Sequence, residues 1–192
     1  MFGDSMLKRV RNSAVAVDLL AGVFEFDLSR TDPVEPVRLA SGAELEVIAG
    51  EGAGGSFFLC GEGHRRPVLY ATSEGQAGLI AADLTAAMEL ITGAPFWPDY
   101  LKFSAGGSLE EMRSAASRLG PELVEDFPEV DDQSAQVRTA LGLGQPSVDE
   151  LLARLHASVT STVPDFVLLG PEGYEYAPLF NTFRVSDNPA WR

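Results

Sequence analysis

Cysteine is almost absent from this sequence, since Cys60 is the single one among 192 residues. One cysteine cannot form a disulfide within the chain, and a chain that folds without disulfides is typical of a reducing compartment. Its hydrophobic content of 45% is ordinary for a globular domain. A hydrophobic core, rather than covalent cross-links, must therefore stabilise the fold.

Long hydrophobic runs are also missing. A membrane-spanning helix needs about 20 consecutive apolar residues, and Asp18 and Glu25 interrupt the apolar N-terminal stretch. That stretch does not resemble a signal peptide either, because Asp4 precedes its basic residues and no small-residue cleavage site follows. We expect a cytoplasmic protein that does not bind a membrane.

Positive charge is scarce. Lys8 and Lys102 are the two lysines, and 14 basic residues face 28 acidic ones, for a formal net charge of −14. An acidic surface repels phosphate backbones, so we expect no nucleic-acid partner. The same charge favours rapid encounter with a basic protein. The alternative is that the acidity only supports solubility.

Catalytic and metal-binding motifs are lacking as well. His64 and His156 each stand alone, and Cys60 has only His64 near it in sequence, without a set of base and orienting group. No G-x-S-x-G sequence is present. We interpret Cys60 as a small core residue and His156 as a boundary residue of a helix. No cofactor and no metal ion are expected.

Glycines are plentiful in one stretch, in which Gly50, Gly52 and Gly55 match the spacing G-x-G-x-x-G. A dinucleotide-binding loop needs a helix after the glycines. The five residues that follow, Ser-Phe-Phe-Leu-Cys, form a short apolar run typical of a strand. The kinase arrangement is excluded because the next strand carries Arg65 and Arg66 but no lysine, and neither H-R-D nor D-F-G follows. The stretch therefore predicts a hairpin turn.

Hydrophobic periodicity predicts helices and an antiparallel meander of short strands, with a mainly helical C-terminal extension that ends in a hairpin. An apolar stripe predicts one helix over residues 5–25, packed on the core or serving as a dimer seam. Short strands are expected between residues 44 and 81. A helix capped by Asp83 follows them.

The turn at residues 104–108 divides the chain into residues 1–104 and an extension, residues 105–192, which we expect to pack on the same core. Ser108 with Glu111, and Ser147 with Glu150, predict capping boxes of two helices. Residues 166–169 and 174–176 predict the terminal hairpin.

An acidic stretch between the two capped helices is the first candidate for a partner-binding surface. Pro121 and Pro128 flank its residues, which favours a solvated loop or a helix edge rather than a catalytic site. Trp97 and Tyr100 are candidate anchors if they are exposed, with core packing as the alternative. The candidate acidic residues are Glu125, Asp126, Glu129, Asp131 and Asp132.

Residues 45–103 resemble the SUKH superfamily, in its Smi/Knr-like branch. The resemblance is carried by the Gly-rich turn and aromatic strand at 50–59, the Pro-Val-Leu-Tyr run at 67–70, and the segments 73–78, 80–84 and 95–97. Two features depart from the family pattern. Residues 5–25 lack its Leu-Pro pair and its Tyr-x-x-Phe run, and Met88-Glu-Leu90 replaces its Phe-Leu.

This resemblance implies an α+β fold with a central antiparallel sheet flanked by helices, in a non-enzymatic domain that binds a protein. Many bacterial members of the superfamily are immunity proteins that block toxins. Our first hypothesis is therefore a protein-binding domain, with a basic toxin as one class of partner. The second is a small-molecule-binding protein or enzyme whose site brings His64, Arg65 and Arg66 together with the acidic stretch. The third is a homo-oligomeric structural protein.

Overall fold

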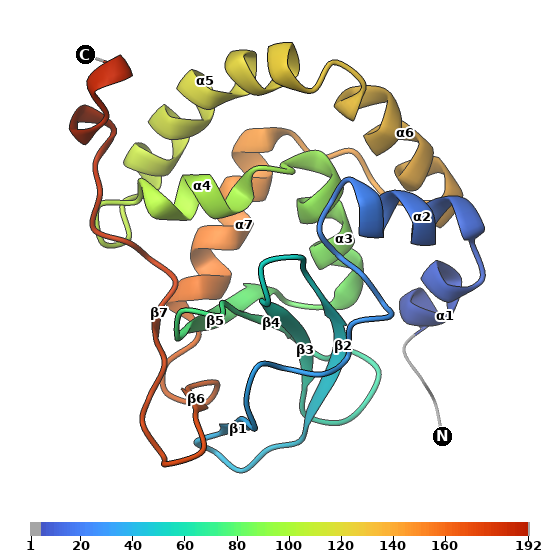
Figure 1. Cartoon of the computed structure of the whole chain (residues 1–192), viewed down its shortest axis with the longest axis vertical. Helices are drawn as coiled ribbons and strands as arrows, with labels where there is room; N and C mark the ends of the chain where they lie inside the picture. Colours follow the sequence, from blue (N-terminus) through green and yellow to red (C-terminus); the bar gives the residue numbers. More distant parts are fainter. Residues whose placement is uncertain (1–4, 192) are drawn as a thin grey trace.

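The computed structural model describes residues 5–191 and shows a mostly antiparallel sheet with helices packed on it (Figure 1). The strands are β1 (Arg38–Leu39), β2 (Leu45–Gly50), β3 (Ser56–Cys60), β4 (Val68–Ala71), β5 (Gln76–Ala81), β6 (Leu168–Leu169) and β7 (Ala177–Pro178). The α-helices are α1 (Ser5–Arg11), α2 (Ala14–Gly22), α3 (Leu84–Gly93), α4 (Trp97–Lys102), α5 (Leu109–Asp126), α6 (Val130–Leu141) and α7 (Val148–Thr160). Two 3-10 helices, η1 (Val185–Asp187) and η2 (Pro189–Trp191), follow near the C-terminus. The predicted α+β fold class is confirmed.

The main sheet has the strand order β2-β3-β4-β5-β7. Its first four strands form the antiparallel meander that the sequence predicted, and β7 is added in parallel to β5. The glycine-rich stretch is the turn between β2 and β3, since Gly50 pairs with Ser56. A phosphate-binding helix N-terminus does not follow it, as expected.

Both faces of this sheet are covered. Side chains of β3 alternate between two clusters: Phe57 and Leu59 belong to the main core beneath the helices, whereas Phe58 and Cys60 belong to a smaller cluster. The two-stranded sheet of β1 and β6 contributes Leu39 and Leu168 to the smaller cluster. This double coverage explains why the strands are continuous apolar runs rather than alternating ones.

The N-terminal prediction of one helix over residues 5–25 is wrong. The chain forms two helices, α1 and α2, because the Ser13 hydroxyl caps α2 by accepting a hydrogen bond from the Ala16 N–H at 3.2 Å. A Ser inside a periodic stripe can restart a helix in this way. Met6, Leu7 and Val10 of α1 are buried in the chain's own core.

The C-terminal part has one more helix than the sequence indicated. The helix α6 was missed between the acidic stretch and α7, whereas the starts of α5 and α7 at Ser108 and Ser147 are as expected. The capping box of α7 is complete. The capping box predicted for α5 is not completed by Glu111. Its carboxylate accepts a hydrogen bond from the Val185 N–H at 2.9 Å, and this bond attaches the C-terminal tail to the helix.

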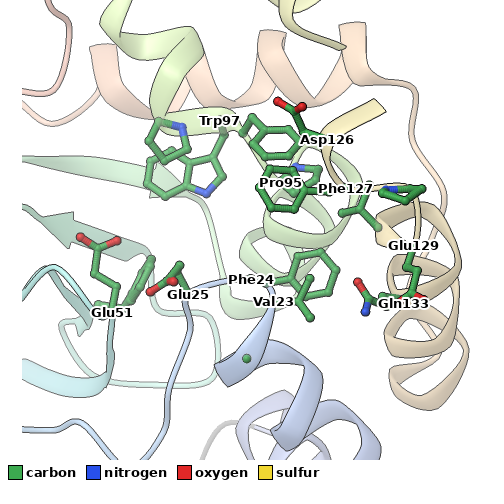
Figure 2. Close-up of a pocket in the computed structure, with 16 residues that line it drawn as sticks. Val23, Phe24, Glu25, Glu51, Pro95, Trp97, Asp126, Phe127, Glu129 and Gln133 are labelled. Atoms are coloured by element: carbon green, nitrogen blue, oxygen red, sulfur yellow. The ribbon is translucent and has the colours of Figure 1, made fainter. Parts of the chain in front are cut away.

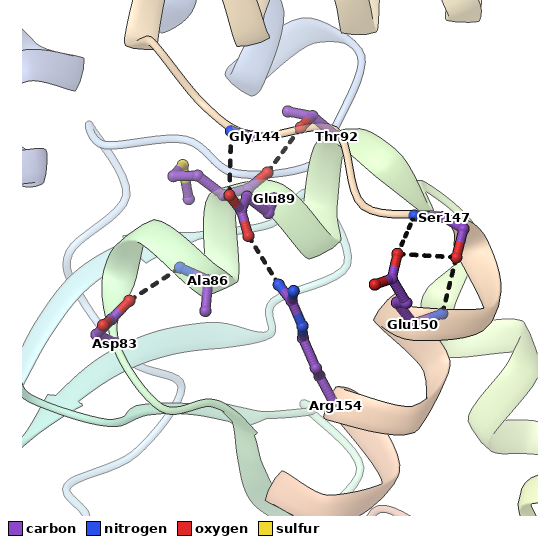
Figure 3. A network of polar contacts seen from close by, with 9 residues as sticks. Asp83, Ala86, Glu89, Thr92, Gly144, Ser147, Glu150 and Arg154 are labelled. Atoms are coloured by element: carbon purple, nitrogen blue, oxygen red, sulfur yellow. Dashed lines mark hydrogen bonds and ion pairs between the residues drawn. The ribbon is translucent and has the colours of Figure 1, made fainter.

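Polar contacts tie α3 to the C-terminal helices (Figure 3). The Glu89 carboxylate of α3 accepts hydrogen bonds from the Gly144 N–H at 3.1 Å and from Arg154 of α7 at 3.0 Å. The main core contains side chains from both halves of the chain, such as Leu20 and Leu155. Residues 105–191 therefore share one core with the residues before them.

The predicted hairpin is present around a turn at residues 170–173. The Gly170 N–H donates to the Tyr174 carbonyl, and the Tyr176 N–H donates to the Leu168 carbonyl. Its two strands belong to different sheets, since β6 pairs with β1 and β7 pairs with β5. Among the helices described in residues 5–191, none is long and apolar enough to cross a bilayer.

Candidate functional site

A pocket of about 610 Å³ opens where four connecting segments meet. These are the end of α2 at residues 22–25, the β2–β3 turn at Glu51, the α3–α4 turn at residues 95–98, and the α5–α6 turn at residues 126–130. Figure 2 shows Glu25 and Glu51 on one side of the pocket and Asp126, Glu129 and Gln133 on the opposite side, with Pro95 and Trp97 between them. Its volume is in the range typical of ligand sites.

Glu25 connects the end of α2 to the β2–β3 turn. Its backbone has a positive φ of 53°, which is uncommon for a residue with a side chain. Its carboxylate accepts a hydrogen bond from the Gly52 N–H at 2.8 Å. A Cβ at position 52 would lie 3.1 Å from the same carboxylate oxygen, so a glycine suits this close approach.

Glu51 is half-buried on the same side of the pocket. Its carboxylate accepts a hydrogen bond from the Tyr70 hydroxyl at 2.7 Å. Burial raises the pKa of Glu51, and repulsion from Glu25 adds to this, whereas the Tyr70 hydrogen bond opposes it. A Cβ at Gly55 would lie 2.5 Å from a carboxylate oxygen of Glu51. The glycine-rich turn therefore makes room for a carboxylate instead of cradling a phosphate.

Aromatic rings form the wall behind these carboxylates. The Tyr70 ring meets Trp97 edge-on, with ring centroids 5.0 Å apart, and Phe57 lies 4.9 Å from Tyr70. At the α5–α6 turn, Phe96 packs beside Phe127 with ring centroids 6.0 Å apart. Phe127 is 56% exposed, so it adds an apolar surface at the pocket that water reaches.

The pocket carries negative charge without a matching positive charge. Glu25, Glu51, Asp126 and Glu129 line it, and no lysine, arginine or histidine is among the 16 lining residues. Within residues 5–191, none of these four carboxylates belongs to an ion pair. An arrangement of this kind attracts a cation and repels phosphate.

The acidic stretch turns out to be two helix ends and a short turn. Asp126 closes α5 and Glu129 precedes α6, and both line the pocket together with Trp97. Glu125 is exposed on α5, while Asp131 and Asp132 are exposed in the first turn of α6. These three side chains do not line the pocket.

The two aromatic candidates have different positions. Trp97 is 4% exposed but still lines the pocket, whereas Tyr100 is equally buried and does not line it. Burial raises the pKa of Tyr100 to about 12. Tyr100 is a core residue, which was the alternative stated for it. Trp97 combines a core position with a surface inside the pocket.

Sequence reasoning missed the residues that complete the site. Glu25 and Glu51 were not singled out, nor were Phe24, Phe57 and Phe127. Glu51 lies between two glycines of the glycine-rich turn. A charged residue in that place was the one available signal of a functional side chain, although it is equally typical of a solvated surface turn. Nothing in the linear pattern showed that this turn would meet the α5–α6 turn.

The other candidate residues lie elsewhere. Cys60 is buried, and burial raises its pKa to about 12, as expected for an unreactive core thiol. His156 is half-buried, with Nε2 2.8 Å from the Gly107 carbonyl oxygen, which confirms its boundary position. Arg65 faces Asp83 at 3.7 Å and Arg66 pairs with Glu46 at 2.5 Å.

Those arginines do not meet the acidic stretch. His64 and Arg65 line a smaller hollow of about 360 Å³ at the start of α3, and none of its lining residues comes from residues 122–132. The second hypothesis placed His64, Arg65 and Arg66 beside the acidic stretch. The structure does not bring these residues together in one pocket. Within residues 5–191, no three His, Cys, Asp or Glu side chains are grouped to hold a metal ion.

No protein-family model, curated protein or solved structure matches this chain. The resemblance of residues 45–103 to the SUKH superfamily therefore stays a prediction.

Proposed function

We propose that this chain is a non-enzymatic protein-binding domain that holds a basic protein at the acidic, aromatic-walled pocket. The observation that carries this proposal is the group of four pocket carboxylates without a cationic partner in residues 5–191. The net charge of −14 acts in the same direction by steering a basic partner toward the surface.

The kind of partner follows from the resemblance to immunity proteins. A toxin that cleaves nucleic acid needs a basic cleft, and carboxylates can occupy such a cleft in place of phosphates. We propose a basic toxin as the partner and the cytoplasm as the place of action. The buried, unpaired Cys60 is compatible with that compartment.

The test is capture of partners from the lysate of the source organism with the tagged full chain. We expect one basic protein to be retained at low salt and released at high salt, because screening weakens attraction between exposed charges. A lysate that yields no retained protein, or a retained protein that salt does not release, contradicts the proposal.

Two variants locate the binding surface with matched charge. D126N/E129Q removes two charges that line the pocket, whereas D131N/D132N removes two from the neighbouring exposed turn of α6. All four side chains are exposed, so the two pairs differ in position rather than in burial. We expect D126N/E129Q to weaken capture by about tenfold and D131N/D132N by about twofold, since a partner seated in the pocket contacts the first pair directly. Equal losses would indicate attraction by overall charge and would contradict binding at the pocket.

A second candidate function is acid–base chemistry on a small molecule. It is favoured by the raised pKa of the Glu51 carboxyl in a pocket that also holds other carboxylates. A thermal-shift screen of metabolites against the full chain tests it. A ligand that stabilises the wild-type chain but not E51Q, and that is converted only by the wild type, would favour this function over protein binding.

A further inference from the structure

The side of the pocket formed by Glu51 and Trp97 has the chemistry of a guanidinium site. We propose that it receives the side chain of an arginine from the basic partner, with the guanidinium against the Glu51 carboxylate and beside the Trp97 ring. This inference rests on the proposed function and names the group that the pocket recognises.

Glu51 is held in a fixed position at the pocket. The Tyr70 hydroxyl holds its carboxylate at 2.7 Å, and Tyr70 in turn packs edge-on against Trp97. The three side chains form one connected unit in which the carboxylate and the indole are held in place. A carboxylate that is already fixed in this way loses little side-chain entropy when it binds a cation.

The electrostatic surroundings of Glu51 favour a bound cation. Glu25 lies close enough to disfavour the ionised form of Glu51, and burial acts in the same sense. The other charged or titratable groups that face this pocket are Asp126 and Glu129 from the α5–α6 turn and the Tyr70 hydroxyl from β4. A cation at Glu51 relieves the repulsion between carboxylates and replaces the water that burial removes.

The aromatic lining of the pocket favours arginine over other cations. A planar guanidinium stacks on aromatic rings while it donates to a carboxylate, whereas an ammonium is a compact and strongly hydrated point charge. The half-buried Phe96 and the exposed Phe127 supply accessible aromatic surface, and the buried Trp97 also lines the pocket. A metal ion fits poorly, because no group of three suitable ligands is present in residues 5–191.

The size of the pocket indicates that the arginine arrives on a protein segment. Its volume of about 610 Å³ exceeds that of a single side chain. Asp126 and Glu129 lie across the pocket from Glu51 (Figure 2), where a second basic residue of the same segment can face them. The exposed ring of Phe127 provides apolar contact for the residues between the two.

The test uses acetyl-arginine-amide as an isolated side chain and the full-length ¹⁵N-labelled chain. The readout is the indole N–H resonance of Trp97, which the W191F variant separates from that of Trp191. We expect a saturable shift with acetyl-arginine-amide, a smaller one with acetyl-lysine-amide, and none with acetyl-citrulline-amide, the uncharged analogue of the same shape. Equal shifts with the citrulline and arginine compounds would overturn the proposal.

Two variants distinguish the pocket from the general charge of the molecule. E51Q is expected to weaken acetyl-arginine-amide binding by about tenfold, which corresponds to the loss of one charge-assisted hydrogen bond. E125Q removes the same charge from an exposed residue outside the pocket and is expected to change the affinity by less than about twofold. Equal effects of E51Q and E125Q would overturn the arginine site.

The two proposals fail in different ways. If a basic protein is captured equally by the wild type and E51Q, the proposed function stands and the arginine site is wrong. If acetyl-arginine-amide binds at Trp97 and E51Q weakens it, but no basic protein is captured, the guanidinium specificity stands and the protein-binding function is wrong.

Discussion

At the scale of single residues, the position of Glu51 in the pocket disfavours its ionised form. Burial and the neighbouring Glu25 raise its pKa above the ordinary glutamate value, so the folded chain binds this proton more tightly than the unfolded chain does. The ionised side chain therefore reduces the free energy of unfolding at neutral pH. A group of this kind is a cost to stability that binding a cation would offset.

The sign of this effect leads to a prediction for E51Q. Because the folded-state pKa is raised, the free energy of unfolding of the wild type falls, relative to that of E51Q, as the pH rises from about 4 through the raised pKa. Glutamine keeps an acceptor for the Tyr70 hydroxyl. Urea unfolding between about pH 4 and about pH 8 should show E51Q to be more stable than the wild type at the upper end, with the difference closing at the lower end.

The matched control is again E125Q, an exposed residue of α5. Its free energy of unfolding should stay within about 0.5 kcal/mol of the wild type at each pH. A wild type that is more stable than E51Q at about pH 8 would show that Glu51 is paired favourably within the chain.

At the scale of elements, patterns predicted what depends on near neighbours in sequence. The meander of β2 to β5 and the capped starts of α3, α5 and α7 follow from alternating turn signals and Ser or Asp caps. The break between α1 and α2 and the existence of α6 were not predicted. Four of the first five residues of α6 are polar. Its buried residues recur at helical spacing, but one of them is Ser134, so the apolar stripe visible in the sequence is weak.

One connection between elements is made by a single side chain. Thr162, just after α7, is buried, and its hydroxyl accepts a hydrogen bond from the Leu79 N–H of β5 at 2.9 Å. The strand β7 pairs with β5 only at Gln76 and Ala77, so this N–H depends on the threonine. Gly78 beside it leaves the room, since a Cβ there would lie 3.0 Å from the same hydroxyl oxygen.

T162V should therefore lower the free energy of unfolding by about 1–3 kcal/mol, the range for a buried donor left without a partner. The shape of the side chain is nearly unchanged, so packing contributes little. T162S keeps the hydroxyl and should lose less than T162V. Urea denaturation of both variants checks this. A loss confined to T162S, with T162V as stable as the wild type, would show that the methyl group rather than the hydrogen bond matters.

At the scale of the whole molecule, the hydrophobic core is continuous. It contains Leu20 and Phe57 from the first part of the chain and Val137 and Leu155 from the C-terminal helices. The C-terminal tail also packs against this part of the molecule, because the Trp191 ring contacts the Phe103 ring with centroids 4.8 Å apart. A shared core predicts cooperative unfolding of residues 5–191 as one unit.

The two tryptophans allow this to be measured. In W191F the fluorescence reports on Trp97 at the pocket, and in W97F it reports on Trp191 in the tail. Each fluorescence transition in urea should coincide with the far-UV circular dichroism transition of the same variant. An earlier, separate fluorescence transition in W97F would show that the tail or the extension unfolds independently.

The site was only partly accessible to sequence reasoning, for a physical reason. Asp126, Glu129 and Trp97 were candidates because a polar turn between prolines and an aromatic cluster are visible in the linear sequence. Glu25 and Glu51 were not, because each looks like a residue of a solvated turn. Their roles arise only when α2, the β2–β3 turn and the α5–α6 turn are packed together.

By itself, the sequence determined the α+β class, the glycine turn, most of the strands and caps, the lack of disulfides and the excess of negative charge. These properties depend on composition and on contacts between residues near one another in the chain. Only the tertiary structure decided that two helix ends and a hairpin turn enclose a carboxylate pocket without a counter-ion in residues 5–191. Such a pocket is made by long-range packing, and the linear order of residues does not specify which turns meet.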